Sequence, residues 1–214
     1  MFEEPGTRWR YGYSADVLAA VAEVVTGERI ADLMRARIFA PLGMVDTRYE
    51  PLPQDRAEMA TIYTQDAEGD LIVVPDRYDT DWNAGGGGLV STATDYMRFA
   101  LMLWNGGEYQ GVRILQQSTI DAMREPHMPS GVLADAGIDG LGWGLGMAVV
   151  VDEEASMVPD RSGDFWWSGY YGTTFVVSPA TGLVGIIYTQ NEPGEFTGLP
   201  YQVYVLQGLA YAGL

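Results

Sequence analysis

The 214-residue sequence has no cysteine, no lysine and a single histidine, and each absence bears on the chemistry open to it. Without cysteine there are no disulfides, no thiolate metal ligands and no cysteine nucleophile. A lone His127 in a proline-flanked segment is typical of a solvent-facing loop and argues against a zinc site, so we expect neither metal nor cofactor. Without lysine, the chain cannot activate a nucleophile with a lysine of its own.

Positive charge is also scarce, since 12 basic residues, all arginine, stand against 29 acidic ones and leave a net charge of −17. Such a surface repels nucleic acid and anionic membranes, so we expect neither as a partner. A solvated acidic surface is the simplest explanation, and adaptation to high salt is the alternative. The apolar stretches fall far below the ~20 residues of a membrane span. Residues 1–7 are not typical of a signal peptide, so we expect a soluble protein, with a cytoplasmic location favoured.

Helical periodicity dominates the first two thirds of the chain, and capping residues and glycines mark the boundaries. The predicted helices run from Ser14 or Asp16 to Gly27, over 28–39 with Pro41 as the end, from a Thr92–Asp95 capping box to Asn105, from Ser118 and Asp121 to a point before Pro126, and over 201–211. In the last of these, we expect Val203, Leu206 and Ala210 on the buried side.

Extended patterns dominate the last third. Runs of β-branched and aromatic residues predict strands over 144–151, 173–178 and 183–189, and the turn at 179–182 joins the last two as an antiparallel hairpin. Residues 49–84 lack a clear period and allow at most short strands or hairpins. Helices followed by three antiparallel strands and a closing helix indicate an α+β domain.

Two short aromatic segments are the candidates for chemistry. Trp9-Arg10-Tyr11-Gly12-Tyr13 stands just before a predicted helix, and Trp167-Ser168-Gly169-Tyr170 lies in the strand-rich region. Because the pKa of tyrosine is near 10, Tyr11 acts as a base at neutral pH only beside a cation, and Arg8 and Arg10 are the nearest in sequence. On residue type alone, such aromatics more often pack a core or a sheet edge.

Taken in this order, the two segments resemble the second and third motifs of the class C β-lactamase and family VIII carboxylesterase group. Pro41-Leu42-Gly43-Met44, residues 86–92 and Asn105-Gly106-Gly107 extend the resemblance over nearly the whole chain. The resemblance implies a β-lactamase/transpeptidase-like α+β fold, in which an antiparallel sheet is flanked by helices. A single domain would then occupy residues 1–214, as the carboxyl-terminal portion of that fold.

The resemblance also implies roles for individual residues. Tyr11 takes the place of the catalytic tyrosine, and the backbone N–H of Tyr170 forms half of an oxyanion hole. The residues expected to bind substrate are Tyr13, Tyr78, Trp82, Trp167, Ser168 and Gly169. That group takes its nucleophile and base from a Ser-x-x-Lys motif, which this sequence does not contain.

Two departures from the β-lactamase pattern bear on the substrate. Tyr13 stands where β-lactamases have an asparagine, and Trp167 stands where they have the lysine of Lys-Thr-Gly. Both changes remove polar groups that those enzymes use on lactams. They indicate a small, neutral ester or amide as the substrate, with β-lactamase or D-amino-acid peptidase activity as alternatives within the family.

The missing motif leads to an expectation about the chain as a whole. We expect part of a serine hydrolase that acts on carboxylic esters through an acyl-enzyme, inactive alone and incomplete at its amino terminus. One sheet edge and part of an apolar face would then be uncovered, which favours self-association or binding of a missing amino-terminal half. The alternatives are a non-catalytic, truncated or degenerate chain that binds a ligand or partner, and one half of a split enzyme.

Overall fold

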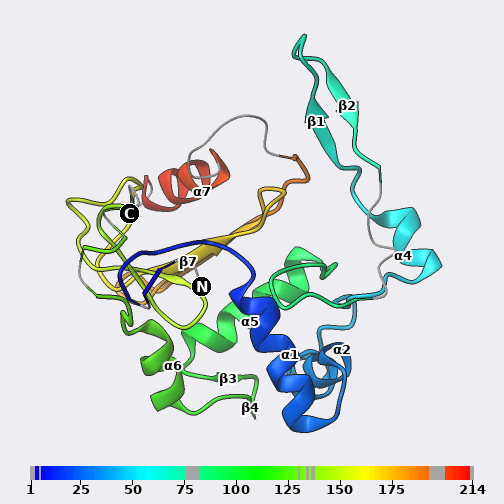
Figure 1. The fold of residues 1–214 in the computed structure, drawn as a ribbon, viewed down its shortest axis with the longest axis horizontal. Coiled ribbons are helices and arrows are strands. Elements are labelled where there is room, and N and C mark those ends of the chain that lie inside the picture. The colour runs from blue at the N-terminus through cyan, green and yellow to red at the C-terminus, as the bar shows by residue number, and fades with distance from the viewer. Residues whose placement is uncertain are drawn as a thin grey trace.

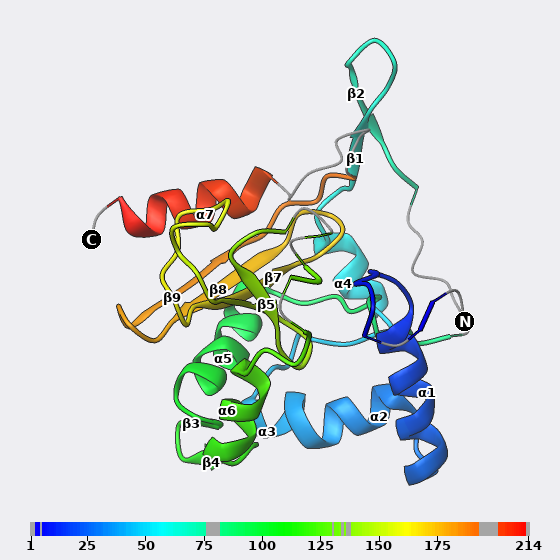
Figure 2. The ribbon, with the colours of Figure 1, turned by 60° about the vertical axis from the view of Figure 1, so that its left-hand side comes forward.

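A computed structural model describes residues 3–4, 6–75, 82–129, 131–133, 135, 138–192 and 201–212. Tyr78, which was predicted to bind substrate, lies outside these described residues. Within them, an antiparallel sheet lies between one helix on its first face and several helices on its second (Figures 1 and 2).

The elements follow one another in a mixed α and β order. They are α1 (Ser14–Thr26), α2 (Ile30–Met34), the π-helical turn η1 (Arg35–Phe39), α3 (Ala40–Leu42), α4 (Pro53–Glu58), β1 (Tyr63–Gln65), β2 (Leu71–Val73), α5 (Ala93–Trp104), β3 (Glu108–Tyr109), β4 (Val112–Arg113), α6 (Gln117–Arg124), β5 (Leu141–Trp143), β6 (Ala148–Val150), β7 (Phe165–Ser168), β8 (Thr174–Ser178), β9 (Leu183–Ile187) and α7 (Tyr201–Tyr211).

The main sheet has five strands in the order β5-β6-β7-β8-β9, and each pairs antiparallel with its neighbours. The prediction of three strands was therefore too low, because the short strands β5 and β7 were not recognised from their periodicity. The predicted strand at 144–151 also began too early, since Gly144 and Gly146 form the turn that joins β5 to β6. The predicted hairpin of β8 and β9 is confirmed.

Each face of the sheet has its own apolar core. Phe165, Phe175 and Val177 pack on the face covered by α5, together with Phe39 and Ile120. The opposite face carries a second cluster that includes Trp166 and Val176, against which Leu206 of α7 packs. Because side chains alternate along a strand, neighbouring residues of β7 serve different cores. No helix among the described residues has the length and apolar character needed to cross a bilayer.

Helix α1 confirms the predicted helix but not its cap. Its first turn is preceded by Tyr13, and no side chain caps it, whereas Gly27 ends it in the left-handed conformation as predicted. Only Ala19 is buried. The apolar residues Val17, Leu18, Val21, Val24 and Val25 are 52–84% exposed. An apolar stripe of this helix is therefore uncovered within the described structure.

The second predicted helix differs from the structure at both ends. It begins at Ile30, continues through η1, and ends only after Leu42, so Pro41 lies inside its last turn. Gly43, in the left-handed conformation, is the residue that ends it. Pro41 directly follows the π-helical turn η1, at the second position of α3.

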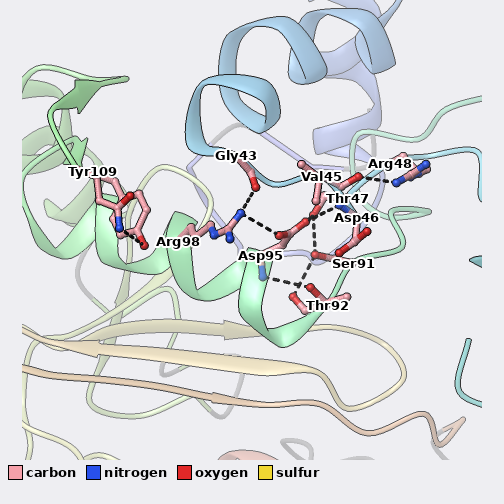
Figure 3. A network of polar contacts seen from close by, with 11 residues as sticks. Gly43, Val45, Asp46, Thr47, Arg48, Ser91, Thr92, Asp95, Arg98 and Tyr109 are labelled. Carbon is pink, nitrogen blue, oxygen red and sulfur yellow. Dashed lines mark hydrogen bonds and ion pairs between the residues drawn. The ribbon is translucent and has the colours of Figure 1, made fainter. Parts of the chain in front are cut away.

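Helix α5 is fastened by a buried carboxylate to the loop that follows α3 (Figure 3). Thr92 accepts the backbone N–H of Asp95, as a cap does. The Asp95 side chain does not complete the predicted capping box, because it accepts the Asp46 N–H at 2.8 Å and the Thr47 hydroxyl at 3.0 Å. Arg98 donates to the Gly43 carbonyl beside it. The acid thus ties α5 to the loop at residues 43–47.

Residues 49–84 contain the short helix α4 and a two-stranded hairpin, β1–β2, that extends away from the body of the molecule (Figure 1). At its base, the Tyr63 N–H donates to the Gln190 carbonyl at 2.9 Å, and the Glu192 N–H donates to the Tyr63 carbonyl at 2.7 Å. All three residues of β2 are exposed. The hairpin is therefore anchored beside the end of β9.

The two remaining helices also differ in detail from expectation. Helix α6 begins at Gln117, and neither Ser118 nor Asp121 caps it. Helix α7 has the predicted bounds, but its fully buried side chain is the polar Gln207, and Leu206 beside it is only partly buried. The side chains of Val203 and Ala210 lie outside the described part of the structure.

Candidate active site

Tyr11 and Trp167 meet at one end of the sheet, although 156 positions separate them. The indole Nε1–H of Trp167, on β7, donates a hydrogen bond of 3.1 Å to the Tyr11 hydroxyl oxygen. Their ring centroids are 5.7 Å apart. Tyr11 is 66% exposed, so its hydroxyl oxygen is held by the protein while the ring remains open to solvent.

Two further tryptophans support this pair. Trp9 lies 5.8 Å from Tyr11 between ring centroids, and 5.7 Å from Trp143 of β5. Trp143 in turn stands perpendicular to Trp167 at 4.5 Å. Each contact is within the range in which aromatic pairs add stability beyond their buried area. The four rings thus hold Tyr11 against the sheet, and sequence reasoning did not foresee the part played by Trp143.

The turn after β7 contains the backbone N–H that was predicted to bind an oxyanion, that of Tyr170. Gly169 donates its N–H to the Thr173 carbonyl at 2.7 Å, and Gly172 donates to the Gly169 carbonyl at 3.0 Å. A Cβ on Gly169 would lie 2.2 Å from the Thr173 hydroxyl, so a larger residue here would require the Thr173 side chain to turn away. The backbone N–H of Tyr170, within the turn, has no hydrogen-bond acceptor among the described residues.

The other predicted binding residues are placed differently. The Ser168 hydroxyl bonds that of Thr174 at 2.8 Å, and strand alternation directs it to the face opposite Trp167. The Tyr170 ring is exposed, and its hydroxyl lies 3.5 Å from a Glu192 carboxylate oxygen. Tyr13 and Trp82 are also exposed. Substrate contact by these four residues stays a prediction.

A glycine-rich loop holds the start of α1. The Gly86 N–H donates to the carboxylate of Asp16, the third residue of α1, at 3.0 Å. A Cβ on Gly85 would lie 2.1 Å from the Ala15 carbonyl oxygen. The run of glycines was a visible signal, but its use as a packing surface for α1 was not predicted.

Neither Arg8 nor Arg10 pairs with Tyr11 within the described residues. Arg10 forms an ion pair with Glu3 at 2.5 Å, and Arg8 lies 3.6 Å from the same carboxylate. The hydrogen bond from Arg10 lowers the pKa of Glu3 below its usual value. The hydrogen-bond donor to the Tyr11 hydroxyl is the neutral indole of Trp167. His127 is exposed and lies 2.8 Å from the Ala122 carbonyl through Nε2, and no metal-binding group of three His, Cys, Asp or Glu occurs among the described residues.

Comparison of the sequence with known proteins identifies relatives of this chain. Protein Rv1367c of Mycobacterium tuberculosis is 29% identical over 205 residues, which are 90% of this chain and 51% of that protein. Esterase EstB of Burkholderia gladioli is 28% identical over 215 residues, covering 91% of this chain and 52% of EstB. The chain thus spans about half the length of the curated relatives it matches.

The fold agrees with these sequence matches. The solved structure of EstCE1, described as a hydrolase with promiscuous acyltransferase activity, superimposes with a TM-score of 0.78 at 26% identity, over 96% of this chain and 56% of EstCE1. The sequence model of the Beta-lactamase family matches residues 2–207. With its α+β fold of the β-lactamase/transpeptidase type, this chain belongs to the β-lactamase family of serine hydrolases.

Proposed function

We propose that this chain supplies the tyrosine and one oxyanion-binding N–H of an active site that cleaves small, neutral carboxylic esters through an acyl-enzyme. The observation that carries the proposal is the hydrogen bond between Trp167 and Tyr11, which joins the two motif segments at one end of the sheet. The esterase name of EstB and the description of EstCE1 favour ester chemistry.

The indole has a chemical consequence for the tyrosine. An N–H that donates to the phenol oxygen stabilises the phenolate, the form in which Tyr11 accepts a proton. Trp167 does this without a positive charge, so the position offers no cation to a substrate carboxylate. Neutral esters suit such a site better than anionic lactams do.

In the proposed reaction a serine hydroxyl attacks the ester carbonyl carbon, and Tyr11 accepts the serine proton. The Tyr170 N–H donates to the resulting oxyanion. Collapse of the intermediate expels the alkoxide, which takes the proton from Tyr11. Water then attacks the acyl-serine by the same route and releases the acid. The serine and the lysine beside it belong to a Ser-x-x-Lys segment that the 214 residues do not contain.

The exposed stripe of α1 is the surface on which such a segment would pack. It begins six residues after Tyr11 and carries five exposed apolar side chains, from Val17 to Val25. An apolar stripe of this width normally faces a core. A polypeptide that covers it would bring its own side chains to the Tyr11 end of the sheet.

The test is complementation. The chain alone should not hydrolyse a short-chain nitrophenyl ester above background, whereas a mixture with a polypeptide that carries the family's Ser-x-x-Lys segment should. Tyr11→Phe should lower the rate of the mixture by about 10²- to 10⁴-fold, because a proton acceptor is lost. Trp167→Phe removes the donor to Tyr11 but keeps the proton acceptor, so it should lower the rate less.

Tyr204→Phe, on the helix that covers the other face of the sheet, is the matched control and should leave the rate unchanged. Full activity of the Tyr11→Phe mixture would refute the role of Tyr11. A mixture that associates but never hydrolyses esters would support the alternative of a non-catalytic chain that binds a partner.

A further inference from the structure

A second group of polar side chains is buried between the sheet and α7. Asp160 and Asp164 lie in the segment before β7 and are 2% and 0% exposed. Ser178, the last residue of β8, and Gln207, on α7, are both 0% exposed. The acyl-transfer site at Tyr11 uses none of these four residues.

The fold brings Asp164, Ser178 and Gln207 together, and the Asp160 carboxylate is close enough to that of Asp164 to interact with its charge. Phe165 pairs with Val177 across β7 and β8, so Asp164 and Ser178 stand opposite each other one step further along. The Tyr211 hydroxyl donates to an Asp164 carboxylate oxygen. Gln207 precedes Tyr211 by four positions, about one helical turn, and therefore lies on the same face of α7.

Part of each side chain is engaged, and part is not. Oδ2 of Asp160 accepts the Ser156 hydroxyl at 2.8 Å, and Oδ2 of Asp164 accepts the Arg161 N–H at 2.9 Å. The other oxygen of each carboxylate has no hydrogen-bond partner within the described residues. The same holds for both amide atoms of Gln207. The Ser178 hydroxyl lies within reach of the Tyr211 hydroxyl. Buried polar groups without partners are rare and call for a ligand or water.

The charge of the two aspartates indicates whether a cation or water occupies this place. Neither Asp160 nor Asp164 forms an ion pair in the described structure. The Arg161 guanidinium lies over the Tyr211 ring at 5.2 Å and donates to the Asp160 backbone carbonyl. Burial raises the pKa of Asp160 to about 6. The hydrogen bond from Ser156 and the Arg161 charge oppose this rise, and the Asp164 and Glu153 carboxylates add to it. Water can complete the hydrogen bonds but cannot compensate two buried carboxylates.

We propose that Asp160, Asp164, Ser178 and Gln207 bind a hard divalent cation of the Ca²⁺ type between strands β7 and β8 and helix α7. All four residues offer oxygen ligands: the two aspartates a carboxylate each, Ser178 a hydroxyl and Gln207 an amide carbonyl. Ca²⁺ accepts such a mixed oxygen set, whereas Zn²⁺ prefers nitrogen and sulfur. The cation clamps α7 onto the sheet.

The proposal is tested on the whole chain by thermal unfolding and calorimetric titration with CaCl₂ after treatment with EDTA. At a free Ca²⁺ concentration about 100 times the dissociation constant, the melting temperature should rise by about 5–10 °C. Asp160→Asn and Asp164→Asn should each abolish the Ca²⁺-dependent rise. Glu154→Gln removes an exposed acidic charge six positions before Asp160, and this variant should retain the Ca²⁺-dependent rise.

If an aspartate variant does not fold, Ser178→Ala provides a milder loss of one ligand, and the wild-type chain gives an independent reading. Tb³⁺ bound under α7 should emit when tryptophan is excited, because Trp166 belongs to the same face of the sheet, and Ca²⁺ should displace it. A wild-type chain that neither binds Ca²⁺ nor gains stability overturns the proposal and leaves a hydrated acid pair. A full Ca²⁺ effect in Asp164→Asn overturns it as well. Neither result bears on the role of Tyr11.

Discussion

Helices α1 and α5 are nearly equal in length, 13 and 12 residues, and both carry apolar residues at helical spacing, yet their surroundings differ. Helix α5 buries Ala100, Met102 and Leu103 against the sheet. Helix α1 buries only Ala19 and exposes its valines and Leu18. The same sequence period thus predicts a helix in both places but does not say whether anything covers it.

Each helix also has an aspartate in its first turn that reaches a distant part of the chain. Asp95 is buried and accepts hydrogen bonds from Asp46 and Thr47, whereas Asp16 is half-buried and accepts one from Gly86. The α5 contact belongs to the core, and the α1 contact holds a helix at the surface. The stability of the chain should therefore depend strongly on α5 and weakly on α1.

The largest contrast is expected from truncation of one apolar side chain on each helix. Leu103→Ala should lower the free energy of unfolding by about 2–5 kcal/mol, because it leaves a cavity between α5 and the sheet. Val24→Ala on α1 should change it by no more than about 0.5 kcal/mol, since Val24 is 84% exposed. Urea unfolding measures both. Equal losses would mean that α1 is covered in solution, for example by a second copy.

The two aspartates give the next contrast. Asp95→Ala should cost about 2–3 kcal/mol, because the Asp46 N–H and the Thr47 hydroxyl lose a charged acceptor in a buried place. Asp16→Ala should cost about 0.5–1 kcal/mol, because water can replace the bond to Gly86. The comparison is made by urea unfolding at neutral pH. A larger loss for Asp16→Ala would show that the glycine-rich loop contributes more to stability than its exposure indicates.

The smallest effect concerns how the free energy of unfolding changes at alkaline pH. Burial raises the pKa of Tyr96, on α5, from 10.0 to about 12. The folded state keeps this phenol neutral while the unfolded state ionises above pH 10, so its contribution is complete below pH 10 and is lost as the pH rises through about 12. At pH 11 the loss should be about 1.4 kcal/mol.

Tyr96→Phe should remove that part of the pH dependence, which is followed by unfolding between pH 9 and pH 11. Absorbance of the phenolate provides a second measurement. Tyr13→Phe, at a ring that is 80% exposed, is the control and should leave the alkaline slope unchanged. A slope that disappears with Tyr13→Phe instead would contradict the assignment to Tyr96.

Much of the fold could be predicted from local sequence. Gly27 ends α1, Thr92 caps α5 and residues 179–182 turn between β8 and β9, because each depends on the conformational preferences of a few neighbouring residues. Strands β5 and β7 were missed, since three or four residues show no reliable period and their pairing comes from their neighbours in the sheet. The π-helical turn at 35–39 had no signal at all.

The candidate site shows the same division. The sequence by itself determined the absence of lysine and of a Ser-x-x-Lys motif, the excess of acidic charge and the two aromatic segments with their family resemblance. Only the tertiary structure decided that Trp167 donates to Tyr11, that the Asp16 carboxylate accepts the Gly86 N–H, and that two aspartates lie buried under α7. Partners 70 and 156 positions apart are brought together by the packing of a sheet and its helices, which no local preference specifies.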